Sequence, residues 1–407
     1  MVPSGWKVKS PSKLFKLFSG FAFKSSDAQE SGAKWLKIAN VGIGEIKWDA
    51  DSFLPENFLI EHKKYLLTKG DIVVALTRPT IGNKLKVARL NRDSDTSLLN
   101  QRVAKIVCEE NVDSEFIFQV LRSDQFAFRI NVGLLGTDPP NLSVKVLEDF
   151  TIHVPPLPEQ RKIAAILSTW DKAITTTEQL LANSQQQKKA LMQQLLTGKK
   201  RLLDENGERF RGEWKEVAVS SFGKVVTGST PPKDNDSNYG GDISWATAED
   251  FKCKYVANTK VKLTKSGASK ARVVPKGSVL VTCIASIGKN AIANEILATN
   301  QQINAVVINS HHSNEFFYYL VEFNTHRLLA LAGTTAVPIL NKTSFEKIRF
   351  KTPCKEEQQK IASVLTAADN EISALQQKIE ALKQEKKALM QQLLTGKRRV
   401  EVDEVAA

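Results

Sequence analysis

Side chains that can donate several hydrogen bonds gather in short segments at matching places in the two halves of the chain. These segments are residues 34–37, 77–84 and 100–102 in the first half, and residues 245–247, 286–289 and 300–302 in the second. Arginine and lysine bind phosphate oxygens, while arginine, asparagine and glutamine can read base edges. The residues expected to make such contacts are Lys37, Thr77, Arg78, Asn83, Lys84, Asn100, Gln101, Arg102, Thr247, Ser286, Lys289, Asn300, Gln301 and Gln302.

Several residues in these segments have a competing structural role. Trp35 and Trp245 are expected to anchor a core rather than stack on bases, because aromatic rings dominate core packing. Gly82 suits a tight turn, although a glycine would also let a phosphate approach the backbone. The amides of Asn100 and Asn300 can contact bases or hold their own loops, and the sequence leaves both roles open.

The chain of 407 residues carries a formal net charge of +13. This excess serves solubility, and it also favours a polyanionic partner, with nucleic acid the first candidate. The four cysteines form no C-x-x-C pair, so neither a zinc site nor a disulfide framework is predicted. Residues 1–23 lack the apolar core of a secretory signal, and no apolar stretch is long enough to span a membrane. We therefore expect a cytoplasmic protein.

Three kinds of short motif could indicate catalysis or metal binding, and each has a simpler interpretation. Residues 138–141 approach the D-P-P-[YF] motif of amino-methyltransferases, but Asn141 replaces the aromatic that stacks on the flipped base, which favours a proline turn. Residues 45–47 and 61–63 match E-x-K, a triplet expected by chance in a chain that is 25% charged. The histidines at 311–312 have no further ligand at metal-binding spacing. Because a phosphate-binding P-loop is also missing, we predict a non-catalytic chain with no metal site.

The elements that position the polar segments are repeated along the chain. Residues 188–199 read KKALMQQLLTGK, and residues 386–397 read the same, an offset of 386 − 188 = 198. Asp171 and Asp369 keep this offset, whereas Trp6 and Trp214 are 208 apart, so insertions and deletions fall outside the helical segments. A tandem duplication gives one polypeptide two similar halves, like the subunits of a two-fold dimer.

Each half opens with a mixed segment of short strands, turns and helices. Residues 69–76 predict a turn followed by a buried strand, and residues 276–283 predict the same in the second half. The predicted fold class is α+β, with two similar mixed α/β domains, residues 1–153 and 206–352.

A long helical segment follows each domain, over residues 154–205 and 353–407, and each helix ends at a glycine, Gly198 or Gly396. Both helices carry a stripe whose steps alternate between four and three residues, the pattern of a coiled coil. The apolar stripe residues expected to pair the helices are Ile163, Leu167, Trp170, Ile174, Leu181, Leu191 and Leu195, and Ile361, Leu365, Ile372, Leu375, Ile379, Leu382, Leu389 and Leu393.

The stripes predict that the two helices pack on each other, because single-stripe helices of this length need a partner. Packing of each helix on the globular domains is the alternative. The lysine runs 188–189 and 386–387 are identical in the two helices, and Lys188 and Lys386 stand at matching positions within the stripes. This identity suggests a shared role, such as docking identical partner subunits, and the alternative is a polar position that sets the helix register.

Taken together, these features resemble the DNA specificity (S) subunit of type I restriction–modification systems. The resemblance covers nearly the whole chain and rests first on the order domain, helix, domain, helix. It rests also on P-L-P-E-Q-R-K-I-A at residues 156–164, on L-L-T-G-K at 195–199 and 393–397, and on residues 226–232, 241–245 and 286–289.

The resemblance implies two target-recognition domains that each read one half of a bipartite, asymmetric site in double-stranded DNA. It implies that the helices form an antiparallel coiled coil, set the spacing between half-sites and dock two modification (methyltransferase) subunits, which restriction subunits then join. Residues 19–25 differ from residues 227–232, which fits two different half-sites.

The resemblance also places the chemistry elsewhere. S-adenosylmethionine, ATP and Mg would belong to the partner subunits, with no cofactor bound by this chain. The alternatives are a stand-alone nuclease or methyltransferase, or a coiled-coil interaction protein without specific DNA recognition.

Overall fold

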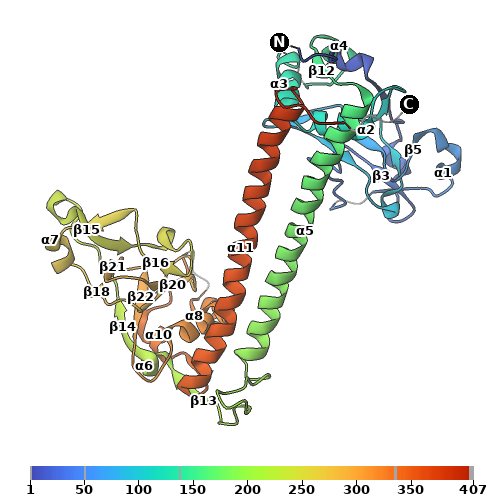
Figure 1. Ribbon diagram of the computed structural model, residues 1–407. Helices are drawn as coiled ribbons and strands as arrows, with labels where there is room; N and C mark the ends of the chain where they lie inside the picture. Colours follow the sequence, from blue (N-terminus) through green and yellow to red (C-terminus); the bar gives the residue numbers. More distant parts are fainter. Residues whose placement is uncertain (1, 50–51, 137–138, 334–336, 403–407) are drawn as a thin grey trace. The chain divides into compact units, whose positions relative to one another are not determined.

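The computed structural model describes residues 2–49, 52–136, 139–333 and 337–402 (Figure 1). The chain forms two compact units: unit 1 comprises residues 1–177 and 378–407, and unit 2 comprises residues 178–377. Each unit therefore combines one mixed domain with part of both long helices, because the division cuts α5 (Leu157–Leu195) and α11 (Lys355–Leu393) near their middles. The four-segment division expected along the chain stays a prediction.

The mixed domain of unit 1 contains two four-stranded sheets. The first is antiparallel and has the order β2 (Phe15–Ser19), β11 (Val103–Cys108), β6 (Ile72–Ala75) and β9 (Val87–Arg89). The second has the order β4 (Phe53–Leu54), β3 (Ala33–Leu36), β10 (Ser97–Leu99) and β5 (Leu66–Leu67), with β10 parallel to β3. The remaining elements are β1 (Lys7–Lys9) paired with β12 (Ile152–Val154), the hairpin β7 (Thr80–Ile81) and β8 (Lys84–Leu85), and helices α1 (Phe58–Glu61), α2 (Ser114–Leu121), α3 (Asp124–Gly133) and α4 (Val144–Glu148).

Unit 2 repeats the two sheets, and its first sheet has five strands instead of four. Its first sheet has the order β14 (Gly223–Thr227), β22 (Ile303–Ile308), β19 (Val279–Thr282), β20 (Asn290–Ala293) and β16 (Tyr255–Val256). Its second has the order β17 (Val261–Leu263), β15 (Tyr239–Ala246), β21 (Leu297–Thr299) and β18 (Val273–Val274), with β21 parallel to β15. The remaining elements are β13 (Lys215–Ala218) paired with β23 (Arg349–Thr352), and helices α6 (Val219–Phe222), α7 (Lys265–Ser269), α8 (Asn314–Phe323), α9 (Thr325–Leu331) and α10 (Lys342–Lys347).

The two strands predicted to be buried are central strands of the first sheets. All residues of β6 and of β19 are buried, and each strand has a neighbour on both sides. Gly70 and Gly277 precede them with φ values of +97° and +86°, which glycine adopts without strain. The predicted turn followed by a buried strand is therefore confirmed in both halves.

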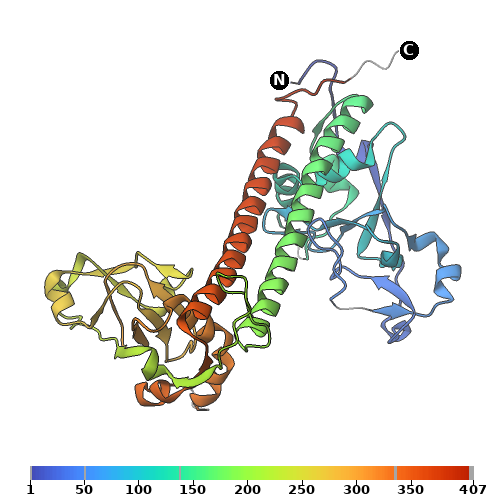
Figure 2. The same ribbon diagram turned by 60° about the horizontal axis from the view of Figure 1, so that its bottom comes forward.

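In each unit, part of α5 lies beside part of α11, and the two run antiparallel (Figure 2). Contacts at the helix ends require this direction. In unit 1 the Trp6 indole donates a hydrogen bond to Glu159 in the first turn of α5 (2.7 Å), and Glu159 pairs with Arg399, which follows α11. In unit 2, Glu357 in the first turn of α11 pairs with Arg201, which follows α5, at 2.7 Å. The start of one helix thus meets the end of the other in both units.

All residues of the predicted stripes are buried or half-buried, so the predicted antiparallel pairing is confirmed. The alternative, packing on the globular domains, also holds at the helix ends. The stripe residues that enter a domain core are Ile163, Leu167, Leu389 and Leu393 in unit 1, and Leu191, Leu195, Ile361 and Leu365 in unit 2.

An ion pair with a largely buried lysine joins the two helices in each unit. Lys386 of α11 pairs with Asp171 of α5 in unit 1, and Lys188 of α5 pairs with Asp369 of α11 in unit 2, both at 2.7 Å. The lysine side chains are only 7% and 14% exposed, respectively, so both amines are engaged inside the chain. The docking interpretation is therefore wrong for these two lysines, and their pairing supports the alternative that they set the register.

The mixed domain adds a third charge to each pair, and this charge has opposite sign in the two units. Arg122 follows α2 and pairs with Asp171 at 2.8 Å, whereas Glu322, the counterpart of Arg122 in α8, pairs with Lys188 at 3.0 Å. Burial and the nearby Arg122 charge lower the pKa of Lys386 to about 8. Burial also opposes the charge of Lys188, but hydrogen bonds and charges from Asp369 and Glu322 outweigh it and raise its pKa.

In each unit a glycine, Gly20 directly after β2 or Gly228 directly after β14, packs against the turn that follows β10 or β21 in the second sheet. A Cβ atom on Gly20 would lie 2.2 Å from the Leu99 carbonyl oxygen and 2.4 Å from that of Asn100. A Cβ atom on Gly228 would lie 2.1 Å from the Asn300 carbonyl oxygen. These distances are far inside van der Waals contact, so a larger residue would displace the turn that follows β10 or β21.

Replacement of the two lysines by methionine is expected to destabilise the units unequally. Lys188→Met leaves Asp369 and Glu322 as two half-buried carboxylates without their lysine, which should cost about 3–5 kcal/mol. Lys386→Met leaves Asp171 paired with Arg122, so about 1 kcal/mol is expected. Urea denaturation, followed by circular dichroism, measures the free energy of unfolding of both variants. Adding Glu322→Gln to Lys188→Met should recover part of the loss, and equal losses for the two lysines would contradict the assignment of the third charge.

Substitution of the packed glycines provides a second test. Gly20→Ala and Gly228→Ala are each expected to lower stability by about 2–3 kcal/mol, because the added methyl group overlaps backbone atoms. Gly212→Ala is the control, since no atom lies within 4 Å of its Cβ position. Thermal denaturation compares the three variants, and an unchanged melting temperature for Gly20→Ala would show that the strand and the turn are not in close contact.

Candidate nucleic-acid interface

Backbone hydrogen bonds bring four separate segments of unit 1 together. The Leu76 amide, at the end of β6, donates to the Arg102 carbonyl oxygen (2.9 Å), and the Gln101 amide donates to that of Phe21 (2.9 Å). The Arg78 amide donates to the Pro140 carbonyl oxygen at 2.8 Å. We call residues 20–21, 76–78, 100–102 and 140–142 edge 1.

Backbone hydrogen bonds also bring the corresponding segments of unit 2 together. The Cys283 amide donates to the Gln302 carbonyl oxygen (2.8 Å), the Ser229 amide to that of Thr299 (2.8 Å), and the Ala285 amide to that of Pro338 (3.1 Å). We call residues 228–230, 283–286, 300–302 and 338–340 edge 2. The sequence predicted two of these four segments in each unit, and the fold shows that they adjoin.

One residue in each edge has an unusual backbone conformation. Arg78 has φ = +46° and Ala285 has φ = +62°, a region that non-glycine residues seldom occupy. Each follows a buried central strand. Each is held by the hydrogen bond that its backbone amide donates to a proline carbonyl oxygen, Pro140 or Pro338. Strain retained at the same place in both units marks these turns as functional candidates.

Many predicted contact residues have side chains that are already engaged within their own domain. Lys37 donates to Ser52 (3.0 Å), and burial lowers the pKa of its amine. Lys84 pairs with Asp124, and the Lys289 amine donates to the Ala248 carbonyl oxygen (2.6 Å). The hydroxyl groups of Thr77 and Thr247 donate to Asn141 and Asp250, respectively.

The asparagine and glutamine that follow β10 and β21 have different roles. Asn100 accepts a hydrogen bond from the Arg102 amide (3.0 Å), and Asn300 bonds both the side chain and the backbone of Gln302. These asparagines hold their turns, the structural role that the sequence had left open. The neighbouring Gln101 and Gln301 are exposed, and Thr230 donates a hydrogen bond to the Gln301 side chain.

The remaining predicted residues, Arg78, Asn83, Arg102 and Ser286, have exposed side chains. With Gln101 and Gln301 they supply the guanidinium, amide and hydroxyl groups that phosphates and base edges require. Whether they contact DNA stays a prediction. Trp35 and Trp245 are 4% and 8% exposed and belong to cores, as expected.

Two segments of each edge were not among the predicted contact residues. One contains the packed glycine, Gly20 or Gly228, and the other contains Pro140 or Pro338. The glycines are 208 residues apart and the prolines 198 apart, which are the two offsets of the duplication. Alignment of the two halves could therefore have identified these segments as equivalent. What the sequence did not reveal is that these segments lie against the predicted turns.

The structure offers little for catalysis in the residues that it describes. They contain no group of three or more histidine, cysteine, aspartate or glutamate side chains placed to hold a metal ion. Burial raises the pKa of Cys108 and of Cys283 to about 11, so neither thiol is ionised at neutral pH. Of the Asp-Pro-Pro-Asn motif, Asp138 lies outside the described residues, and Asn141 braces the turn at Thr77.

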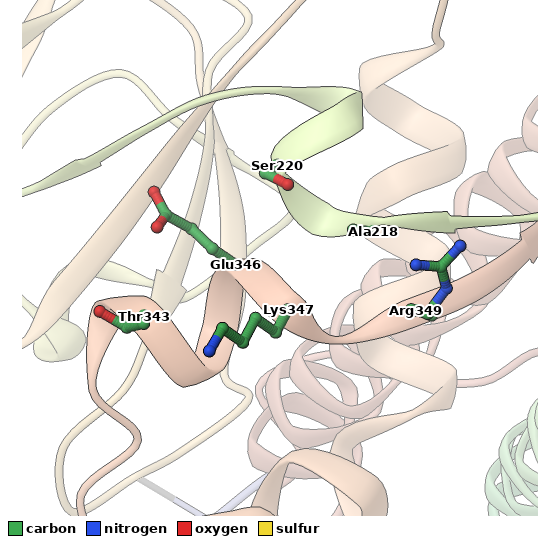
Figure 3. A pocket seen from close by; sticks show the side chains of 6 residues that line it. All are labelled: Ala218, Ser220, Thr343, Glu346, Lys347 and Arg349. Carbon is green, nitrogen blue, oxygen red and sulfur yellow. The ribbon is translucent and has the colours of Figure 1, made fainter.

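A shallow pocket of unit 2 lies away from the predicted contact residues. It is formed by β13, α6, α10 and β23, and its lining combines one acidic and two basic side chains, Glu346, Lys347 and Arg349, with Ser220 and Thr343 (Figure 3). None of the predicted contact residues lines it. No helix in the described part of the chain is both long enough and apolar enough to cross a membrane.

Comparison with known proteins identifies the type of chain. The family model for the type I restriction modification DNA specificity domain matches residues 3–183 and 211–384. The MjaVIII specificity subunit of Methanocaldococcus jannaschii is 37% identical over 206 residues, which are 50% of this chain and 48% of that relative. The aligned chain thus spans about half the length of this relative. The putative MjaX specificity subunit of the same organism is 27% identical over 98% of this chain and 95% of its own length.

The fold is shared with solved S subunits. The S subunit of the type I restriction–modification system of M. genitalium superposes with a TM-score of 0.63 over 97% of this chain and 96% of its own, at 15% sequence identity. The family match includes most of both mixed domains and the larger part of each long helix. The chain therefore belongs to the family of type I restriction–modification DNA specificity proteins.

Proposed function

We propose that this chain is the subunit that gives a type I restriction–modification enzyme its DNA address. Unit 1 would read one half of a bipartite site and unit 2 the other. The observation that carries this proposal is the pair of edges, which share one backbone plan but present different side chains. Two copies of one plan with different contact residues suit an asymmetric site.

The chemistry of the edges supports DNA as the ligand. Arg78 and Arg102 can neutralise phosphates, and Gln101 and Gln301 can hydrogen-bond base edges. The strained turns at Arg78 and Ala285 hold these groups close to the backbone of the central strands. The net charge of +13 favours association with a polyanion, and such binding should weaken as salt concentration rises.

The helices would supply geometry rather than chemistry. We infer that they set the distance between half-sites and dock two methyltransferase subunits, which restriction subunits join. S-adenosylmethionine, ATP and Mg would then be bound by those partners, and this chain would be non-catalytic. A cytoplasmic location, where the enzyme meets DNA, is part of the same proposal.

Methylome sequencing of cells that carry the complete system tests the function. With the chain intact, methylation should occur at a bipartite site, and deletion of the chain should abolish it. Replacement of residues 1–153 by the corresponding domain of a related system should change one half-site only, and replacement of residues 206–352 should change the other. A change in both halves after one replacement would contradict the two-reader proposal, and methylation that persists without the chain would refute the function.

Insertion of helical turns tests the spacing role. Seven residues added between 177 and 178, with seven added between 377 and 378, preserve the stripe of both helices. Each insertion lengthens its helix by ~10 Å, about three base pairs of DNA, so the gap between half-sites should grow while the bases read stay the same. Insertion of six residues is the control, since it breaks the stripe. Altered bases with an unchanged gap would exclude the spacer role.

A further inference from the structure

The two edges differ in kind at the residue that follows the packed glycine. Phe21 in edge 1 and Ser229 in edge 2 make the same backbone bond, from the amide to the carbonyl oxygen of Leu99 or Thr299 (2.9 and 2.8 Å). They therefore occupy equivalent positions, one with an aromatic ring and the other with a small hydroxyl.

Phe21 is held through its backbone and its ring, yet the residue remains partly exposed. Its amide donates to Leu99 and its carbonyl oxygen accepts from Gln101, both at 2.9 Å. Its ring centroid lies 4.5 Å from that of His62, 5.0 Å from that of Phe23 and 5.4 Å from that of Tyr65. Even so, Phe21 is 37% exposed, so the aromatic cluster supports the ring without covering it.

The surroundings of the open ring are those of a base-reading surface. Gln101, bonded directly to the Phe21 backbone, and the next residue, Arg102, present an exposed amide and guanidinium. The Lys64 amine lies over the Tyr65 ring at 6.0 Å. In the major groove, an apolar side chain reads the C5-methyl group of thymine, and glutamine pairs with adenine.

We propose that Phe21 is a specificity-determining residue of unit 1, whose exposed ring packs on the C5-methyl group of a thymine in the half-site that unit 1 reads. This inference rests on the proposed DNA-reading function. It predicts at least one A·T pair in that half-site, placed next to the base pair read by Gln101.

Edge 2 cannot make the same contact at this position. The Ser229 hydroxyl accepts a hydrogen bond from the Arg272 amide (3.1 Å), and its carbonyl oxygen accepts one from the Trp245 indole (3.1 Å). Ser229 therefore offers a small, engaged hydroxyl in place of a ring. The half-site read by unit 2 should be insensitive to any change at Phe21.

Replacing thymine by uracil deletes the methyl group alone, which isolates the proposed contact. The chain in complex with its methyltransferase subunits would be titrated with duplexes in which each thymine of the methylome-defined site is replaced in turn. At one thymine of the half-site of unit 1, uracil should weaken binding about fourfold, the value expected for one buried methyl group. Phe21→Ala should bind the thymine and uracil duplexes equally.

A matched control separates this contact from general damage to the surface. Phe128, in α3 of unit 1, is 57% exposed and lies outside edge 1, so Phe128→Ala should keep the fourfold difference. The scan of the unaltered chain needs no variant and therefore stands even if Phe21→Ala folds poorly.

Three results would overturn the inference while leaving the proposed function intact. They are a half-site for unit 1 that contains no thymine, specific binding that no uracil weakens, and a uracil effect that survives in Phe21→Ala. A complex that binds all duplexes equally would instead refute DNA reading itself.

Discussion

The reciprocal ion pairs between the long helices are the constraint on which the rest of the structure depends. Lys386 with Asp171, and Lys188 with Asp369, connect the helices at matching positions because the chain is a duplication in antiparallel self-contact. A largely buried lysine is costly without a carboxylate partner, and a shifted register would separate Lys386 from Asp171 and Lys188 from Asp369. The stripes alone would allow α11 to shift along α5 by one heptad. The ion pairs do not allow this shift, because it would separate each lysine from its aspartate.

Each mixed domain has its own hydrophobic core, and edge 1 or edge 2 is formed by its loops. The helix ends enter the domain cores through Leu167 and Leu365, which are fully buried. The edges lie at the ends of the central strands, where the packed glycines bring the end of β2 or β14 against the turn after β10 or β21. The shared backbone plan can therefore persist while Phe21 and Ser229 differ.

The parts that follow local rules could be predicted from the sequence. The stripes and the buried strands after Gly70 and Gly277 are periodicities or short motifs. The packing partners of loops could not be predicted, because contacts such as Arg78 with Pro140 join residues far apart in the chain. The sequence showed Lys188 and Lys386 to be equivalent, but only the fold reveals that Asp369 and Asp171 neutralise them, or that Lys37 and Lys84 are engaged.

The opposite signs of Arg122 and Glu322 have a consequence for how such proteins diversify. A lysine–aspartate ion pair has no net charge, and its aspartate can attract a cation while its lysine can attract an anion. In unit 1 the aspartate attracts Arg122, and in unit 2 the lysine attracts Glu322. A foreign domain grafted onto these helices would thus not need a particular charge where it meets them. New DNA addresses could then arise by exchange of whole modules, with no compensating change in the shared scaffold.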